Sequence, residues 1–293
     1  MSTNILITGA STGFGRDTAE TLALAGHQVF ASMRDPQSKN RAHADALRAQ
    51  NIEVIELDVT DSQSVDIAVA AIIAKVGRID VLINNAGVAS AGVSEAFTPE
   101  QVTALFDVNV IGLHRVTRTV LPHFRHNQDG LVINIGSVVG RVTLPFFGVY
   151  GASKFAIEAL TETYRYELSQ LGIDVVLVQP SAYPTQMYAS ASQPEDQART
   201  AEYGEIGKIP AAMFETFNTI FSGPDAPIPH DIAEAVAKLI ATPKGERAAR
   251  TVVGASFGAD VINDAAEPIQ TATVQSLELG HLATVPSLYA KSA

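Results

Sequence analysis

Short apolar runs alternate with longer amphipathic segments along most of this chain. The apolar runs have the length of buried strands and lie at 4–8, 28–32, 52–57, 79–83, 131–135, 173–178 and 250–253. Segments with helical spacing lie between them, at 64–76, 99–127, 150–171 and 229–242, and a further one ends at Gly26. Strands that alternate with helices predict an α/β, doubly wound fold: a mostly parallel seven-stranded sheet with helices on both faces.

The same pattern predicts how the chain is divided. We expect one catalytic domain over residues 1–255, in which 184–229 breaks the α/β rhythm as a substrate lid. Residues 256–293 show little pattern and are expected to form a tail that packs on the body or on a neighbouring subunit. The inserted stretch holds an apolar stripe at helical spacing, which fits either a helix on the core or the inner face of a lid. The stripe consists of Met213, Phe214, Phe217, Ile220 and Phe221.

Composition narrows the class of protein. Hydrophobic residues make up 46% of the 293 residues, and the net charge is −11. Such an acidic chain is a poor partner for nucleic acid or anionic membranes, which attract basic patches. It has no cysteine, no His spacing typical of a metal site, no signal-peptide pattern and no apolar run near the roughly 18 residues of a membrane helix. We therefore expect a cytoplasmic protein without a metal.

A glycine-rich turn follows the first apolar run. Gly9, Gly13 and Gly15 form the pattern TGxxxGxG, which leads directly into a helical segment. Glycines allow a ligand to approach the backbone, and the amino end of a helix attracts phosphate. The turn alone would fit an ordinary loop, but the strand and helix around it favour a cradle for a dinucleotide.

The end of the second run bears on the choice of dinucleotide. Met33 stands where an NAD-binding protein would place a carboxylate for the adenosine ribose. Arg34 follows, and its guanidinium can bind a 2′-phosphate through two hydrogen bonds. The alternative is a solvated arginine. We favour NADP(H) as the cofactor.

Ser137, Tyr150 and Lys154 are the candidate catalytic residues. Ser137 follows the apolar run 131–135, and Lys154 lies one helical turn after Tyr150. An ammonium beside a phenol favours the phenolate, so the pKa of Tyr150 is predicted to fall toward neutrality. An ordinary surface helix is the alternative interpretation of the Tyr–Lys pair alone.

Together these motifs resemble the short-chain dehydrogenase/reductase family. The matching pieces occur in family order and are 8–15 (TGASTGFG), Asp58-Val59, 84–87 (NNAG), Asn109, Ser137 and 150–154 (YGASK). The resemblance covers roughly residues 3–185 and implies a Rossmann fold. The stretch 136–160 is similar to the NADP-using carbonyl, hydroxysteroid and retinol reductases.

The resemblance also implies roles for individual residues. Tyr150 would be the acid/base, Ser137 would orient a carbonyl, and Lys154 would hold the nicotinamide ribose. Asn109 would support a water-linked proton path to Lys154, and Asp58 would face the adenine. The residues implied in cofactor binding are Gly9, Ser11, Thr12, Gly13, Phe14, Gly15, Arg34, Asp58, Val59, Asn85, Ala86, Gly87, Tyr150, Lys154, Pro180 and Thr185.

Two positions depart from the family pattern. The usual Pro-Gly after the sixth strand is Pro180-Ser181 here, and Ser181 lacks the conformational freedom of glycine. Thr12 stands where many NADP-using members have a basic residue, which leaves Arg34 as the main contact for a 2′-phosphate.

The sequence thus predicts an NADP(H)-dependent oxidoreductase that transfers hydride between nicotinamide and a hydrophobic ketone or aldehyde. The alternatives are a catalytically silent NADP-binding regulatory protein and a lyase or epimerase that uses the same tyrosine. A homodimer or homotetramer is expected, because two long helical segments carry apolar residues beyond one core face. These residues are Leu113, Val116, Val120, Ala156, Leu160 and Tyr164.

Overall fold

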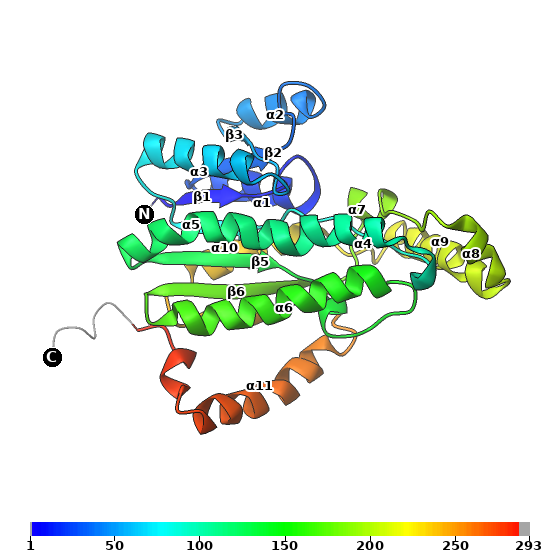
Figure 1. Cartoon of the computed structure of the whole chain (residues 1–293). Helices are drawn as coiled ribbons and strands as arrows, with labels where there is room; N and C mark the ends of the chain where they lie inside the picture. Colours follow the sequence, from blue (N-terminus) through cyan, green and yellow to red (C-terminus); the bar gives the residue numbers. More distant parts are fainter. Residues whose placement is uncertain (1, 287–293) are drawn as a thin grey trace.

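A seven-stranded, all-parallel sheet forms the centre of the molecule (Figure 1). The computed structural model describes residues 2–286. The strand order is β3-β2-β1-β4-β5-β6-β7, so the order reverses between β1 and β4, as in a Rossmann fold. The strands are β1 (Asn4–Ile7), β2 (Gln28–Met33), β3 (Glu53–Glu56), β4 (Val81–Asn84), β5 (Gly130–Ile135), β6 (Ile173–Pro180) and β7 (Arg250–Val253). The predicted fold class is confirmed.

Helices cover both faces of the sheet. One layer consists of α1 (Gly13–Leu24), α2 (Arg41–Arg48) and α10 (His230–Ala241), and the opposite layer includes α3 (Ser62–Val76), α5 (Leu113–Asn127) and α6 (Gly148–Ser169). Successive residues of a strand face opposite layers. In β1, Ile5 and Ile7 pack with the first layer and Leu6 with the second, which explains why the strands are apolar throughout.

The predicted helix 99–127 is interrupted in the structure. It consists of α4 (Pro99–Phe106), the π-helical segment η2 (Asp107–Gly112) and α5. A π-helical turn shifts the register of a helix and often marks a functional position. This segment carries Asn109, one of the predicted site residues. The sequence pattern also missed α2, a short helix between β2 and β3.

The stretch 184–229 lies at the carboxyl end of the sheet (Figure 1). It forms α7 (Gln186–Ala189), α8 (Gln197–Glu202), η4 (Ile206–Lys208) and α9 (Ile209–Phe221). No residue of α9 is buried, so the interpretation of its apolar stripe as a core-packing face is wrong. Instead, the rings of Phe217 and Phe221 pack against Tyr188 of α7.

The expected tail contains helices that the sequence pattern did not reveal. Residues Ala259–Ser276 form the helix α11, followed by η5 (Gly280–Ala283), and Figure 1 shows α11 beside α6. Its apolar residues are mostly exposed, including Val261, Ile262 and Ile269, so no buried stripe revealed it in the sequence. Polar contacts attach it to the body: Gln270 donates a hydrogen bond to Glu162 of α6. Residues 287–293 of the predicted tail lie outside the described residues.

Three of the residues that the sequence analysis predicted for a subunit contact belong to the core of the single chain. Leu113, Val116 and Val120 on α5 are at most 5% exposed within the single chain. They pack against neighbouring elements of the same subunit, so they provide no argument for an oligomer. Among residues 2–286, no helix is both long and apolar enough to cross a membrane.

Candidate active site

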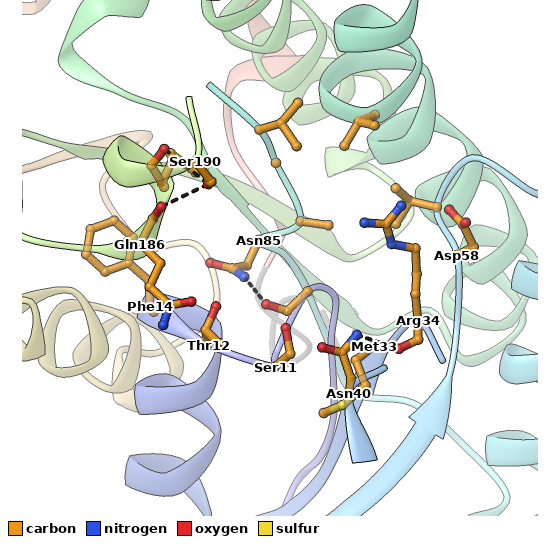
Figure 2. Close-up of a pocket in the computed structure, with 18 of the residues that line it drawn as sticks. Ser11, Thr12, Phe14, Met33, Arg34, Asn40, Asp58, Asn85, Gln186 and Ser190 are labelled. Carbon is orange, nitrogen blue, oxygen red and sulfur yellow. Dashed lines mark hydrogen bonds between the residues drawn. The ribbon is translucent and has the colours of Figure 1, made fainter. Parts of the chain in front are cut away.

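A pocket of about 420 Å³ opens at the carboxyl ends of the central strands (Figure 2). Parallel α/β sheets bind ligands at this edge, where the strand order reverses. Twelve of the predicted cofactor residues line it: Gly9, Ser11, Thr12, Gly13, Phe14, Arg34, Asp58, Val59, Asn85, Ala86, Gly87 and Thr185. It is also lined by residues that the sequence reasoning did not select, namely Lys39, Asn40, Leu57, Val88, Val108, Gln186, Met187 and Ser190.

The glycine-rich turn has the shape of a dinucleotide cradle. A Cβ on Gly9 would lie 2.8 Å from the Ala86 Cα, and a Cβ on Gly15 would lie 2.3 Å from the side-chain nitrogen (Nδ2) of Asn85. Glycine is therefore required where the turn meets the end of β4. The Asn85 side chain fixes this contact by donating to the carbonyls of Thr8 and Gly9 at 2.9 and 3.0 Å.

The amino end of α1 faces this pocket. The helix begins at Gly13. The first amides of a helix have no carbonyl acceptor within the helix, and the Thr12 side chain does not cap them either. A Cβ on Gly13 would meet nothing within 4 Å, which leaves open space above the turn. These features fit a pyrophosphate.

The opposite end of the pocket carries the residues that the sequence predicts for the adenosine half. Met33 is buried at the end of β2, whereas Arg34 is exposed, and Figure 2 shows its side chain extended along the wall of the pocket. The Asn40 amide donates to the Arg34 carbonyl at 2.7 Å and holds this loop. The Asp58 carboxylate accepts from the amide and the hydroxyl of Thr60, which fixes its orientation in the pocket wall.

Asn109 is buried and makes three hydrogen bonds. Its Oδ1 accepts from the Val88 amide at 2.8 Å, and its Nδ2 donates to the Val88 carbonyl and to Ser153 Oγ. The asparagine thus joins the loop after β4 to the helix that carries Tyr150. Gly87 lies between Asn109 and the Lys154 ammonium: a Cβ there would be 3.4 Å from Asn109 Oδ1 and 4.0 Å from Lys154 Nζ.

The structure brings Ser137, Tyr150 and Lys154 together at the end of β5. Lys154 Nζ lies 5.6 Å from the centre of the Tyr150 ring and donates to the Ile135 carbonyl at 3.0 Å. Ser137 follows β5, and its hydroxyl contacts the Val139 amide and the Pro180 carbonyl at 3.3 and 3.4 Å. Pro180 thereby orients Ser137. Four of the predicted cofactor residues do not line the pocket itself: Gly15, Tyr150, Lys154 and Pro180.

The predicted fall in the pKa of Tyr150 is wrong for this structure. Burial raises the pKa of the phenol, the neighbouring Tyr188 raises it further, and a hydrogen bond with Ser137 opposes them only in part. Burial also lowers the pKa of Lys154 to about 8, with the carboxylate of Glu158 opposing that fall. The prediction counted the lysine charge but not the loss of water around both groups.

Helix α7 closes over the phenol. The Tyr150 hydroxyl points at the sulfur of Met187, 4.0 Å away, and the adjoining Tyr188 ring belongs to a cluster with Phe217 and Phe221. No spacing in the sequence tied this short helix to the catalytic side chains. Ser181, in contrast, does not adopt a positive φ, so the absence of glycine there causes no strain.

The sequence profile described as short chain dehydrogenase matches residues 3–196. The chain belongs to this family. Among characterised relatives of this short-chain dehydrogenase, 3-ketodihydrosphingosine reductase of Bacteroides thetaiotaomicron is 41% identical over 62% of the chain. Estradiol 17-beta-dehydrogenase 1 of Rattus norvegicus is 41% identical over 63% of it. The matches span 64% and 55% of those relatives, which is less than two thirds of their length.

Solved structures agree with this family assignment. A short-chain dehydrogenase from Streptomyces avermitilis has a TM-score of 0.76 and 29% identity, covering 96% of this chain and 98% of its own. A variant of actinorhodin polyketide ketoreductase with NADPH has a TM-score of 0.72 at 27% identity, over 88% of this chain and 97% of its own. A family member from Burkholderia phymatum, with NAD, also scores 0.72, at 25% identity over 92% and 95%. The fold therefore accommodates either dinucleotide.

Proposed function

We propose that this short-chain dehydrogenase is an NADP(H)-dependent oxidoreductase acting on a hydrophobic ketone or aldehyde and the corresponding alcohol. The observation that carries the proposal is the convergence of Ser137, Tyr150 and Lys154 beside a glycine cradle that fits a dinucleotide. A regulatory protein that only bound the dinucleotide would not need these three side chains together.

The catalytic side chains have separable tasks. NADP(H), when bound, supplies or accepts the hydride. Ser137, oriented by Pro180 and Val139, binds the carbonyl oxygen of the substrate. Tyr150 keeps its proton at neutral pH because its pKa is raised, and this suits a phenol that donates a proton to the developing alkoxide. With the Ser137 hydroxyl turned from the Pro180 carbonyl to the substrate oxygen and Tyr150 as the second donor, each hydrogen bond stabilises the transition state by about 3 kcal/mol.

Lys154 lies over the Tyr150 ring, with its Nζ 5.6 Å from the ring centre. Its ammonium is held by the Ile135 carbonyl and lies next to Gly87, at the end of the pocket where the nicotinamide ribose would bind. Asn109 fixes the loop that contains Gly87 and the position of Ser153 on α6. In this proposal Lys154 replaces the proton given up by Tyr150, and Asn109 supports a water-linked proton path to Lys154.

The preference for NADP(H) rests on charge. Arg34 and Lys39 line one end of the pocket, and the buried Met33 offers no carboxylate to a ribose hydroxyl. Arg34 supplies a planar pair of donors for a 2′-phosphate. Asp35 also lines this end and opposes the phosphate, so the preference is limited. The related structures include complexes with NADPH and with NAD, so we rest the preference on these residues.

The preference for a hydrophobic substrate rests on the aromatic side chains of α7 and α9. A second cavity, of about 220 Å³, is lined by Tyr188, Phe214, Phe217 and Phe221, together with Ala191, Gln193 and Asn218. The ring of Phe217 also contacts Phe147 in the loop before α6. A cavity lined mainly by aromatic rings favours aryl or long aliphatic carbonyl compounds over sugars.

A reductase assay tests the proposal. Purified protein is mixed with NADPH and a panel of aliphatic, aryl and steroid-sized ketones and aldehydes, and the loss of NADPH absorbance is followed. The proposal expects substrate-dependent oxidation of NADPH in equal amounts to the alcohol formed. A regulatory protein would bind NADPH without consuming it, and a lyase or epimerase would transform its substrate with no net oxidation of NADPH.

A further inference from the structure

Two acidic and two basic side chains form a cluster behind the catalytic residues. Arg141 Nε lies 3.1 Å from Glu158 Oε2, and Arg141 Nη2 lies 2.6 Å from Glu162 Oε1. Arg250 Nε lies 3.3 Å from the same Glu158 oxygen, and its guanidinium also contacts Glu162. Glu158 is only 3% exposed. We call Arg141, Glu158, Glu162 and Arg250 the ion quartet.

The ion quartet is joined to the segments that carry Ser137 and Lys154. Glu158 lies one helical turn after Lys154 on α6. Arg141 follows the short helix η3 (Val138–Gly140), whose cap is Ser137. Position 140 packs closely against α6 and has little room for a side chain: a Cβ on Gly140 would lie 3.0 Å from the Lys154 carbonyl oxygen and 3.1 Å from Glu158 Cγ.

A third connection runs through β6. The Gln179 amide donates to Glu158 Oε1 at 2.5 Å, and Gln179 is fully buried. The next residue is Pro180, whose carbonyl oxygen accepts from Ser137. Glu158 is thus held by groups from the loop after η3, from β6 and from β7. A movement of the Glu158 carboxylate would therefore alter the surroundings of Ser137 as well as those of Lys154.

Helix α11 supplies the outer partners of both carboxylates. Asn263 donates to Gln179 Oε1 at 2.7 Å, so it fixes the amide that binds Glu158. Gln270 donates to Glu162 Oε2 at 2.6 Å. Each carboxylate of the ion quartet therefore uses one oxygen for the arginines and reaches α11 through the other.

The charges around Lys154 give the cluster a consequence for catalysis. Lys154 shares α6 with Tyr150 and Glu158, and α7 brings Tyr188 close to Tyr150. Beyond Glu158 lie the other charged groups: Glu162 of α6, Arg141 of the loop after η3 and Arg250 of β7. The groups near Lys154 from η2 and β5 are uncharged, namely Asn109 and the Ile135 carbonyl. The four charges of the ion quartet cancel, so an amide in place of either carboxylate leaves one uncompensated positive charge. Like charges repel more strongly in a buried setting than in water.

We propose that Glu158 acts through Lys154 by keeping its ammonium charged, and that α11 completes the ion quartet that holds Glu158. The consequence for catalysis rests on the proposed function. The effect on Lys154 is a property of the folded protein, so it can be measured without a substrate.

The direct test is the titration of Lys154 by NMR in protein labelled with ¹³C at the lysine ε-methylene groups. The Lys154 signal is assigned by its absence from Lys154→Met protein. Burial, opposed by Glu158, sets the pKa of Lys154 at about 8 in the wild type. In Glu158→Gln this pKa is expected to fall by about one unit, as a buried unit charge within one helical turn would cause.

The matched control is Glu162→Gln. It removes the same charge from the same ion quartet, but two helical turns from Lys154 instead of one, so the fall should be clearly smaller. An unchanged pKa in Glu158→Gln, or an equal fall in both variants, would overturn the proposal. Glu158→Asp keeps the charge and should keep most of the wild-type pKa, which separates a charge effect from a general loosening of α6.

The role of α11 is tested by activity. Asn263→Leu keeps all four charges but breaks the contact with Gln179, and Ile269→Ala, on the same helix and 70% exposed, is its control. We expect Asn263→Leu to lower kcat several-fold and to bring the alkaline loss of reductase activity to lower pH, as in Glu158→Gln. Equal behaviour of the two α11 variants would refute the part assigned to α11. A wild type that oxidises no NADPH would refute the proposed function, while the titration would still decide the role of Glu158.

Discussion

Replacement of Arg34 by alanine is the sharpest test of cofactor choice. The Arg34 side chain is exposed at one end of the pocket, and within residues 2–286 it forms no ion pair, so it is free to meet a phosphate. Its backbone is fixed by the bond from Asn40 to its carbonyl. The substitution should therefore remove a charged contact without disturbing the loop.

The magnitude follows from this exposure. A hydrogen bond to a charged group contributes about 1.5–3 kcal/mol, and an exposed one lies near the lower limit. At about 1.4 kcal/mol per factor of ten, Arg34→Ala should lower kcat/KM for NADPH about 10-fold, mainly through KM. Lys39 lines the same end of the pocket and should retain part of the preference, which the double variant Arg34→Ala/Lys39→Ala would then remove.

Steady-state kinetics with both cofactors at two ionic strengths provide the assay. Kinetics with NADH should be unchanged in Arg34→Ala, because the residue faces a phosphate that NADH lacks. Raising the salt to about 1 M, where the screening length is about 3 Å, should shrink the preference of the wild type. Asp35→Asn, which removes the opposing charge, should enlarge it. Equal kcat/KM for the two cofactors in the wild type at low salt would refute the reasoning.

Three further outcomes are expected. Tyr150→Phe should lower turnover at least about 100-fold while leaving the Kd for NADPH unchanged in a fluorescence titration; near-normal turnover would contradict its role as the acid. Phe217→Ala removes a ring that contacts Phe147, Tyr188 and Phe221, so KM for aryl ketones should rise up to about 10-fold, and that for small ketones should not. Enzymes of this family often form oligomers, and light scattering should show a homodimer or homotetramer; a 31 kDa species alone at micromolar concentration would contradict this.

The strands and the motifs could be predicted from the sequence, because both depend on residues that are close together along the chain. Buried parallel strands must be apolar on both faces, so the seven runs stood out, and β7 has the predicted bounds Arg250–Val253. The glycine turn is equally local: Gly9 and Gly15 are needed wherever the chain passes this close to the end of β4. Tyr150 and Lys154 share a face of α6 through helical geometry alone.

What the sequence missed depends on contacts between distant segments. The pKa of Tyr150 is governed by burial under α7 and by Tyr188, 38 residues further on, and the spacing to Lys154 contains no information about that burial. Leu113, Val116 and Val120 seemed to extend past one core face, yet the packing of α5 on the sheet buries all three. Helix α11 has no buried stripe, because polar side chains such as Asn263 and Gln270 attach it. Local periodicity thus determined the strands and the motifs, whereas desolvation and long-range polar contacts, which arise only when the chain folds, decided the pKa shifts of the candidate catalytic groups.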